Sequence, residues 1–451
     1  MIRKFISRVL GRSTSTDAVE PAIIPVEQHG LQRDQISRAC RRTIETLQES
    51  GYQAYVVGGA VRDLLAGLTP KDFDVATNAT PEQVRQSFRR ARIIGRRFQI
   101  VHVGIGAETI EVTTFRGHHG DDAGSHGQVD EQGRVLRDNV FGSQSEDAAR
   151  RDFTVNALYY DPACENIVDY HHGVADLRQK TLRMIGDPRT RYREDPVRML
   201  RAVRLAAKLG LSIDPAARRP IREMADLIGN VPPSRLFDEM LKLLTSGHAV
   251  RCVSQLREEG LHRGLLPLLD VILEHPVGER FVILALETTD QRVREGKPVS
   301  PGFLFASLLW HEVLAKWAAL QKDAESPSSH VLFFQAMDEV IEVQGEKLAI
   351  TRRIAGDMKD IWALQPRFQQ RSGKRAYGIL QQPRFKAGYD FLLLRTLAGE
   401  VDSEIGNWWT DFLHADDESR ASMVLGQTGE TTRKRRRRRR SVRASGVEKT
   451  D

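Results

Sequence analysis

Residues 54–77 read AYVVGGAVRDLLAGLTPKDFDVAT, and this stretch decides the fold. The apolar run AYVV has the length of a short buried strand and leads directly into the pair Gly58-Gly59. VRDLLAG then predicts a helical turn that ends at Gly67, and KDFDVAT predicts a second strand. We therefore expect a strand, a glycine turn, a helical turn and another strand in close succession.

The second predicted strand carries two carboxylates at alternate positions. Because residues i and i+2 of a strand point to the same face, Asp72 and Asp74 would lie side by side with Phe73 turned into the core. Adjacent carboxylates repel each other unless a cation lies between them. Hard oxygen ligands of this kind suit Mg²⁺, which usually shares its coordination with substrate phosphates. The spacing therefore predicts a metal site at Asp72 and Asp74.

The glycine turn predicts a place for phosphate groups. Gly58 and Gly59 let backbone N–H groups approach a triphosphate closely, because no side chain intervenes. Arg62 can add charge-assisted hydrogen bonds, and Asp63 belongs to the same turn. An isolated DxD or an isolated GG is common, but the two in this order favour phosphate chemistry.

The chain around this stretch continues to alternate predicted helices and strands. A helix is expected over 80–88, with Thr80 as its N-cap and Gln83 completing a capping box. The other elements expected here are a helix over about 31–50, strands over 100–106, 109–115 and 155–162, and a loop over 117–142.

Strand signals nearly vanish after about residue 174, and amphipathic helices dominate from there on. The predicted fold class is α+β, with a small mixed β-sheet in an N-terminal head and a largely helical remainder. The expected divisions are a flexible basic N-terminal extension (1–30), a head (31–172), a helical neck (173–250), a helical body (251–425) and a disordered arginine-rich tail (426–451).

Charge and cysteine content restrict the class of protein. The net charge of the 451-residue chain is +7, and the positive charge gathers at the two ends, above all in the Lys/Arg run 433–440. The three cysteines are scattered and form no CxxC pair, which favours a reducing cytoplasm. The basic segment 1–16 is interpreted as a disordered end, with weak membrane-surface contact as an alternative.

Three further motifs follow the opening stretch: IEVTTFRG (110–117), RRDFTVNALYYD (150–161) and REDPVRMLRAVRLAAKLG (193–210). Together they resemble the signature of the class II tRNA nucleotidyltransferase and poly(A) polymerase family, which belongs to the DNA polymerase β-like nucleotidyltransferases. The resemblance is strong over residues 50–250 and extends to about 420. It implies a nucleotidyltransferase head, a neck that recognises the nucleotide base and a body that binds RNA.

The resemblance also implies a two-metal mechanism with ATP as substrate. Two Mg²⁺ ions (or Mn²⁺) held by Asp72 and Asp74 would bridge the triphosphate and activate an RNA 3′-hydroxyl for in-line attack. Asp152 is carried over as a further active-site acid, and Glu111 is a candidate third carboxylate. The residues expected at the triphosphate and ribose are Arg151 and Asn156.

Base selection is expected at Glu194–Arg198, where Pro196 opens a predicted helix. Asp195 and Arg198 are three residues apart and would share a face, so that an acceptor and a forked donor could read the edge of a base. The family uses this element as a protein template. The alternative is a helix start with an intrahelical salt bridge. The residues that continue this basic face toward phosphates are Arg201 and Arg204.

The catalytic motifs fit both poly(A) polymerases and CCA-adding enzymes. Three features favour the first: IGRRFQIVHV (94–103), GKRA (373–376) and the terminal arginine run. We expect addition of AMP to the 3′ ends of mRNA, small RNA and tRNA precursors, with RNA-decay machinery as a partner. CCA addition to tRNA and an inactive RNA-binding adaptor remain the alternatives. The residues expected to bind RNA are Arg352, Arg353, Lys374, Arg375, Arg435 and Arg436.

Overall fold

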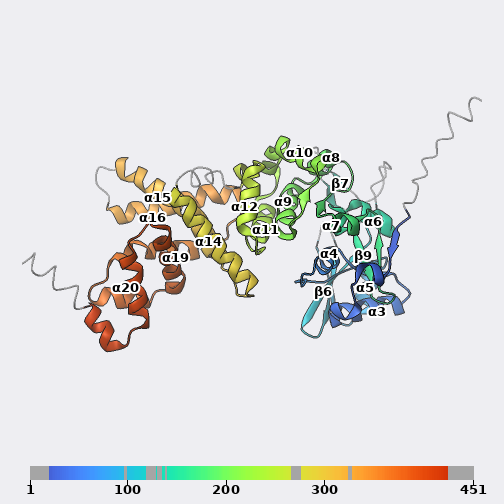
Figure 1. Ribbon diagram of the computed structural model, residues 1–451, viewed down its shortest axis with the longest axis horizontal. Coiled ribbons are helices and arrows are strands. Elements are labelled where there is room, and N and C mark those ends of the chain that lie inside the picture. Colours follow the sequence, from blue (N-terminus) through green and yellow to red (C-terminus); the bar gives the residue numbers. More distant parts are fainter. Residues whose placement is uncertain are drawn as a thin grey trace, which may run out of the picture. The chain divides into compact units, whose positions relative to one another are not determined.

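The structure is a computed structural model that describes residues 20–95, 99–117, 128–129, 135–137, 140–265, 276–323 and 328–424. The chain divides into two compact units, Met1–Met224 and Ala225–Asp451 (Figure 1). The segment 1–16, most of the loop expected over 117–142 and the tail over 426–451 lie outside the described residues. The expected boundaries at 172, 250 and 425 stay predictions.

The first unit is built on an eight-stranded sheet in the order β1-β10-β9-β2-β3-β6-β5-β4. Strands β3 and β6 run parallel, whereas the other neighbours are antiparallel, which confirms the mixed sheet. The strands are β1 (Ala22–Ile24), β2 (Ala54–Val57), β3 (Asp74–Thr77), β4 (Ala91–Ile94), β5 (Ile100–Ile105), β6 (Glu108–Thr114), β9 (Leu158–Asp161) and β10 (Asn166–Asp169).

The opening stretch folds as β2, the helix α4 (Gly59–Leu65) and β3 in the middle of this sheet. The strand expected over 71–77 begins only at Asp74, so the prediction that Asp72 is part of the strand is wrong. The reason lies in β2, whose last residue, Val57, pairs with Asp74 before the chain turns at Gly58. Phe73 packs against the main hydrophobic core, as expected.

Helices α3 (Arg38–Glu49) and α5 (Pro81–Ser87) contribute buried side chains to that core. The predicted capping box of α5 is confirmed, because the Thr80 hydroxyl accepts from the Gln83 N–H and the Gln83 side chain binds the Thr80 N–H. Helix α3 starts later than residue 31. Residues Arg33–Gln35 form a 3-10 turn, and the Ser37 side chain caps the helix.

A second, smaller core contains side chains of the strands that surround β3, among them Val57, Ala76 and Tyr159. Ala76 and Val75 are neighbours on β3 that belong to different cores, so the two cores lie on opposite faces of the sheet. Helix α6 (Gln144–Arg150) adds Ala148 to the smaller core. The short strands β7 (Gln128–Val129) and β8 (Val135–Arg137) pair with each other.

The strands expected over 100–106 and 109–115 are confirmed as the antiparallel pair β5 and β6, but the strand expected over 155–162 begins only at Leu158. Residues Thr154–Asn156 instead form a 3-10 turn, which bends the chain after the motif RRDFT. The remaining elements of the unit are α2 (Val26–His29), α7 (Gly173–Arg178), β11 (Thr181–Leu182), α8 (Pro188–Glu194), α9 (Val197–Leu209), β12 (Ser212–Ile213) and α10 (Pro215–Glu223).

Helices are the regular secondary structure of the described part of the second unit, as expected (Figure 1). Its α-helices are α11 (Pro233–Leu244), α12 (Ala249–Glu258), α14 (Pro276–Arg294), α15 (Pro301–Asp323), α16 (Ser329–Lys347), α17 (Arg352–Leu364), α18 (Lys374–Leu380), α19 (Phe385–Ala398) and α20 (Ser403–His414). By length and composition alone, α15 could cross a membrane. That is weak evidence, because its buried side chains, such as Trp310, belong to the core of this unit.

Candidate active site

Acidic side chains meet at the start of β3. Asp74 is the direct partner of Glu111 across the parallel pair β3–β6, and the exposed Asp72 precedes Asp74 by two residues. Burial raises the pKa of Asp74 to about 6. Glu111 and, more weakly, Asp72 act in the same direction, against Arg151. The imidazole Nε2 of His102 lies 3.3 Å from Glu111 Oε1.

These carboxylates fit a cation. Burial is the main cause of the raised pKa of Asp74, and the charges of Glu111 and Asp72 add to it; a metal ion bound there would favour the ionised carboxylate. Among the described residues, no group of three or more His, Cys, Asp or Glu side chains could by itself hold a metal ion. A metal ion at these carboxylates would need further ligands, such as the substrate phosphates and water through which Mg²⁺ usually binds.

Gly58 occupies a position that no other residue suits. Its φ of +72° lies in the left-handed region, and a Cβ there would come within 3.2 Å of Arg151 Nη1. Gly59 is the first residue of α4, so the glycine pair leads directly into the N-terminus of this short helix. The predicted turn is present, and Arg151 lies against it.

Arg62 and Asp63 are buried and bind each other as well as their surroundings. Arg62 Nε lies 2.8 Å from Asp63 Oδ1, and Arg62 Nη1 lies 2.5 Å from Asn156 Oδ1. Lys208 Nζ on α9 lies 2.7 Å from Asp63 Oδ2. Arg62 therefore donates mainly to protein acceptors and ties α4 to Asn156 and, through Asp63, to α9.

Arg151 is held between α6 and the smaller core. Its Nη2 lies 3.0 Å from Asp147 Oδ2, its Nε donates to the Tyr159 hydroxyl over 3.1 Å, and its guanidinium lies over the Tyr159 ring. The Tyr159 hydroxyl in turn donates to Asp147 over 2.6 Å. These contacts fix the position of the Arg151 guanidinium, the cation that opposes the rise in the pKa of Asp74.

Asp152 lies in a network of donors. Its Oδ2 accepts from Arg201 Nε over 2.7 Å, and its Oδ1 accepts from Asn156 Nδ2 over 2.9 Å. Burial alone would raise the pKa of Asp152, but Arg201, Asn156 and the Phe153 N–H outweigh burial and hold that pKa at about 2. Asp152 is thus a permanently charged acceptor that orients Arg201 and Asn156.

The base-selection element differs from the expected arrangement. Helix α9 begins at Val197, and Arg198 forms a salt bridge of 2.8 Å with Glu194. Asp195 ends α8, and its carbonyl accepts from the Arg198 N–H. This salt bridge joins the last residue of α8 to the first turn of α9, so it is not the intrahelical salt bridge of the alternative interpretation.

Arg191, which sequence reasoning missed, joins the motifs of the head to α8. Its Nη2 donates to the carbonyls of Arg150 and Arg151 over 2.5 and 2.6 Å, and its Nη1 lies 2.9 Å from Glu194. Nothing in the local sequence of Arg191 marks it, because its partners are about 40 residues away.

Several arginines gather around this junction. Burial lowers the pKa of the Arg150 guanidinium to about 10, and the first neighbouring cations to lower it further are Arg116 and Arg191. Arg198 acts in the same direction, and Glu194 opposes it. Cations that gather around Arg150 in this way favour the binding of an anion. Arg116 belongs to the motif FRG and Arg150 to the motif RRD. The arginines of these two motifs could have predicted an anion site from the sequence.

The other predicted residues are spread over both units. Arg204 lies half-buried on α9. Arg352 and Arg353 are exposed in the first turn of α17, and Lys374 and Arg375 are exposed in the first turn of α18. Arg435 and Arg436 lie outside the described residues.

Three family models match the chain in succession. They are described as the poly A polymerase head domain (residues 54–183), the probable RNA and SrmB-binding site of polymerase A (210–273) and the polymerase A arginine-rich C-terminus (326–443). The first match contains the glycine turn, the carboxylates and the RRDFT motif. Fold and site together are those of a nucleotidyltransferase.

Similar proteins narrow the class. Poly(A) polymerase I of Salmonella typhimurium is 43% identical over 424 residues, which are 91% of each chain. A CCA-adding enzyme of a Geobacillus species is 36% identical over 249 residues, 55% of this chain and 59% of the relative. A solved CCA-adding enzyme, apo form II, shares the fold with a TM-score of 0.55, at 16% identity and with 87% and 86% of the two chains covered. The chain belongs to the poly(A) polymerase family.

Proposed function

We propose that the chain adds AMP from ATP to RNA 3′-hydroxyls without a template and releases pyrophosphate. The observation that carries this proposal is the pair Asp74 and Glu111, opposed on parallel strands beside a glycine turn. Full-length similarity to a poly(A) polymerase I supports the choice of reaction.

Asp72 and Asp74 would hold the metal, with Glu111 as the third acid. Bound Mg²⁺ supplies charge that stabilises the triphosphate and lowers the pKa of the RNA 3′-hydroxyl. The protein's own part is to keep Asp74 ionised in a half-buried place, and Arg151 assists by opposing the rise in its pKa. Glu111 adds negative charge there, which strengthens the attraction for a cation.

The triphosphate fits the group of arginines around α6 and α8. Arg116 and Arg191 both lower the pKa of the Arg150 guanidinium, and an anion with several charges would relieve this repulsion. Gly58 and Gly59 allow close backbone approach on the side where Arg151 lies. In this proposal Arg62 and Asp152 act indirectly, because both are bound to Asn156 and hold it in place.

Base choice is proposed for Asp195 and Arg198, with Glu194 as the residue that positions Arg198. Glu194 binds both Arg191 and Arg198, so it connects the phosphate side of the site to the base side. If Arg198 exchanged its salt bridge with Glu194 for contacts to the base of ATP, Glu194 would keep only Arg191 as its salt-bridge partner among the described residues. Base recognition would then be coupled to the position of Arg191.

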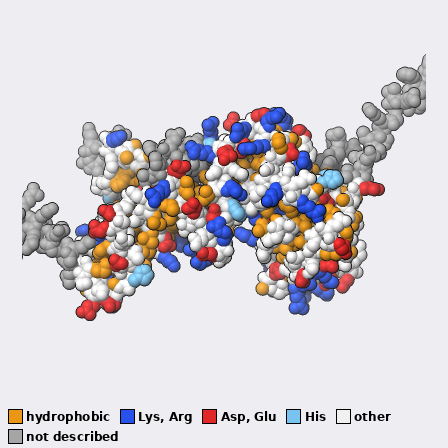
Figure 2. All heavy atoms as spheres, in the orientation of Figure 1, with side chains coloured by type: hydrophobic (Ala, Val, Ile, Leu, Met, Phe, Trp, Pro, Cys, Tyr) orange, Lys and Arg blue, Asp and Glu red, His pale blue; other side chains and the backbone are white. Residues whose placement is uncertain are grey.

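RNA would contact exposed cations on both units. Arg352, Arg353, Lys374 and Arg375 lie in the first turns of helices, where positive charge is unfavourable for the helix itself. Helical stability therefore gives no reason for these residues, whereas phosphate binding does. Figure 2 shows further Lys and Arg side chains where Figure 1 labels α8 and α10. The exposed residues there include Arg189, Arg193, Arg218, Arg219 and Arg222.

In the cell, these properties fit a cytoplasmic enzyme that marks RNA for decay. The polycationic run 433–440 would bind RNA phosphates without regard to sequence. Weak membrane-surface contact of residues 1–16 stays a prediction.

The alternative, CCA addition to tRNA, rests on the CCA-adding relative that matches about half of the chain. To separate the two, the purified protein is given Mg²⁺ with either a generic 3′-hydroxyl RNA and ATP, or a tRNA that lacks CCA with CTP and ATP. A ladder of A residues well beyond three nucleotides on the generic RNA supports the proposal. Extension of the tRNA alone, with growth that stops at CCA, would replace it.

A further inference from the structure

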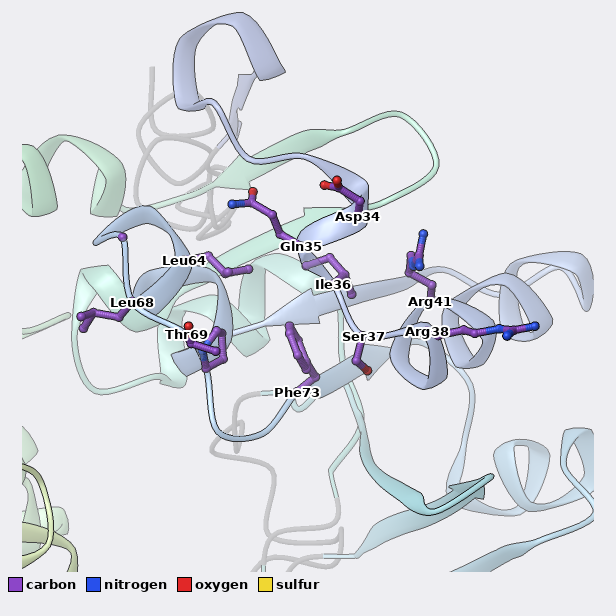
Figure 3. A pocket seen from close by; sticks show the side chains of 12 residues that line it. Asp34, Gln35, Ile36, Ser37, Arg38, Arg41, Leu64, Leu68, Thr69 and Phe73 are labelled. Carbon is purple, nitrogen blue, oxygen red and sulfur yellow. The ribbon is translucent and has the colours of Figure 1, made fainter. Parts of the chain in front are cut away.

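A cavity of about 570 Å³ lies in the first unit between the start of α3 and the segment that leads into β3. Arg38, Arg41 and the cap residue Ser37 line one side, and Leu64, Leu68 and Thr69 line the other. Figure 3 shows Phe73 and Ile36 between these two sides. The volume lies within the range of small-ligand sites.

The two arginine side chains of this cavity have no partner among the described residues. Neighbouring cations on the same surface do have one, because Arg33 lies 2.5 Å from Glu45 and Arg42 lies 3.8 Å from it. For Arg41, the Nε atom is buried and makes no hydrogen bond. A buried guanidinium N–H without an acceptor is costly unless a ligand or water supplies one.

The rest of the lining restricts what the ligand can be. The single acid in the lining is Asp34, so the two cations leave the cavity net positive. Leu64, Leu68, Pro70 and Phe73 offer an apolar surface opposite the charge. A ligand with an anionic group at one end and a flat apolar body at the other satisfies both sides.

We propose that this cavity binds one nucleotide unit of single-stranded RNA, with its phosphate at Arg38 and Arg41 and its base against Leu68 and Phe73. Cationic grooves with an apolar or aromatic wall are a general means of holding single strands without regard to sequence. A second hollow shares Arg38 and Arg41 with this cavity and is also lined by Arg42, Glu45 and Glu108, so that a strand could continue from one hollow to the next along α3.

This site is separate from the catalytic carboxylates. Phe73 packs on the main core and lines the cavity, whereas its neighbours on either side, Asp72 and Asp74, do not line it. The inference does not rest on the proposed reaction, since a protein unable to add nucleotides would keep the cavity. The inference does predict that RNA bound in the cavity contacts Phe73, the residue between Asp72 and Asp74.

Hydrogen exchange on the full chain tests the proposal, with EDTA present so that no nucleotide is added. Oligo(A) RNA should protect the amides of residues 64–73. In the double variant Arg38→Glu/Arg41→Glu this protection should disappear. The matched control is Arg85→Glu, an exposed arginine on α5 that does not line the cavity, and it should leave the protection unchanged.

A variant that is expected to increase the protection shows that misfolding is not the cause of its loss in Arg38→Glu/Arg41→Glu. Asp34→Asn removes the one acid from the lining, and it should increase protection at the same RNA concentration. ATP and inorganic phosphate form the other arms. Protection by ATP but not by RNA would assign the site to free nucleotides and overturn the RNA proposal. Equal protection in wild type and Arg38→Glu/Arg41→Glu, or no protection by any ligand, would overturn the site itself.

Discussion

Asp74 and Glu111 face each other across the parallel pair of strands β3 and β6. The two acids belong to different motifs, 37 positions apart in the chain, and the sheet makes them neighbours. Burial, together with the charge of Glu111, raises the pKa of Asp74 to about 6. A site that accumulates negative charge at a cost in stability is one that function has to explain.

Asp74→Asn should abolish AMP addition and make the protein more stable at neutral pH. The folded-state pKa of Asp74 lies above its ordinary value, so its stabilising proton is lost as the pH rises from about 4 to 6. Removal of the charge should raise the melting temperature by roughly 2–4 °C at pH 7.5. Near pH 4 the gain should be absent. Differential scanning fluorimetry at both pH values checks this. A lower melting temperature at pH 7.5, or activity above a tenth of wild type, would contradict the account.

Metal dependence should change with pH around the same value. Below about pH 6 a proton competes with the metal for Asp74, so the metal concentration for half-maximal activity should rise about tenfold per pH unit. Above that pH it should be nearly constant. Initial rates over a Mg²⁺ titration between pH 5 and 8 measure this. A half-maximal concentration that does not change below pH 6 would show that Asp74 is not a metal ligand.

Glu111→Gln should reduce the rate of AMP addition by about 100-fold or more, on the scale of removing one interaction that stabilises a transition state. The matched control is Glu108→Gln, which lies on the same strand near the hairpin turn and contacts Ser37. The control should stay within a few-fold of wild type. If Glu108→Gln and Glu111→Gln reduce activity equally, Glu111 has no special role.

Base choice should depend on three residues at the junction of α8 and α9. Asp195→Ala and Arg198→Ala should weaken the preference for ATP over CTP more than they slow total turnover. Glu194→Gln should have the same effect in weaker form, because Glu194 holds Arg198. The exposed Arg193→Ala serves as control. Competition assays with both nucleotides measure the ratio. Unchanged selectivity in Asp195→Ala and Arg198→Ala would place base recognition elsewhere.

Deletion of residues 433–451 should weaken RNA binding and flatten its dependence on salt. For each phosphate of a single strand that the shortened protein no longer neutralises, the slope of log K against log salt should become shallower by about 0.7. Anisotropy titrations of one labelled RNA between 50 and 300 mM salt (on the order of the range where such slopes are resolved) provide the comparison. An identical slope would show that the tail does not touch RNA.

The sequence was most informative where structure is local. The turn at Gly58, the capping box of Thr80 and Gln83 and the core position of Phe73 follow from neighbouring residues, and all three are present. The start of β3 was predicted too early, because strand length depends on where the partner strand ends.

Long-range contacts account for what the sequence did not show. Arg191 contacts Arg150 across about 40 positions of the chain, and Arg198 on α9 forms its salt bridge with Glu194, the last residue of α8. Helical spacing alone cannot decide between two adjacent acids. The role expected for Asp152 stays a prediction, now with Arg201 as its bound partner.

The most direct measurement of the central claim is the pyrophosphate released per RNA 3′ end, with Mg²⁺ and each nucleoside triphosphate supplied singly, for wild type and Asp74→Asn side by side. The account predicts many turnovers with ATP, few with the other three nucleotides and none with Asp74→Asn. Equal turnover with ATP and CTP, or turnover in Asp74→Asn, would contradict it.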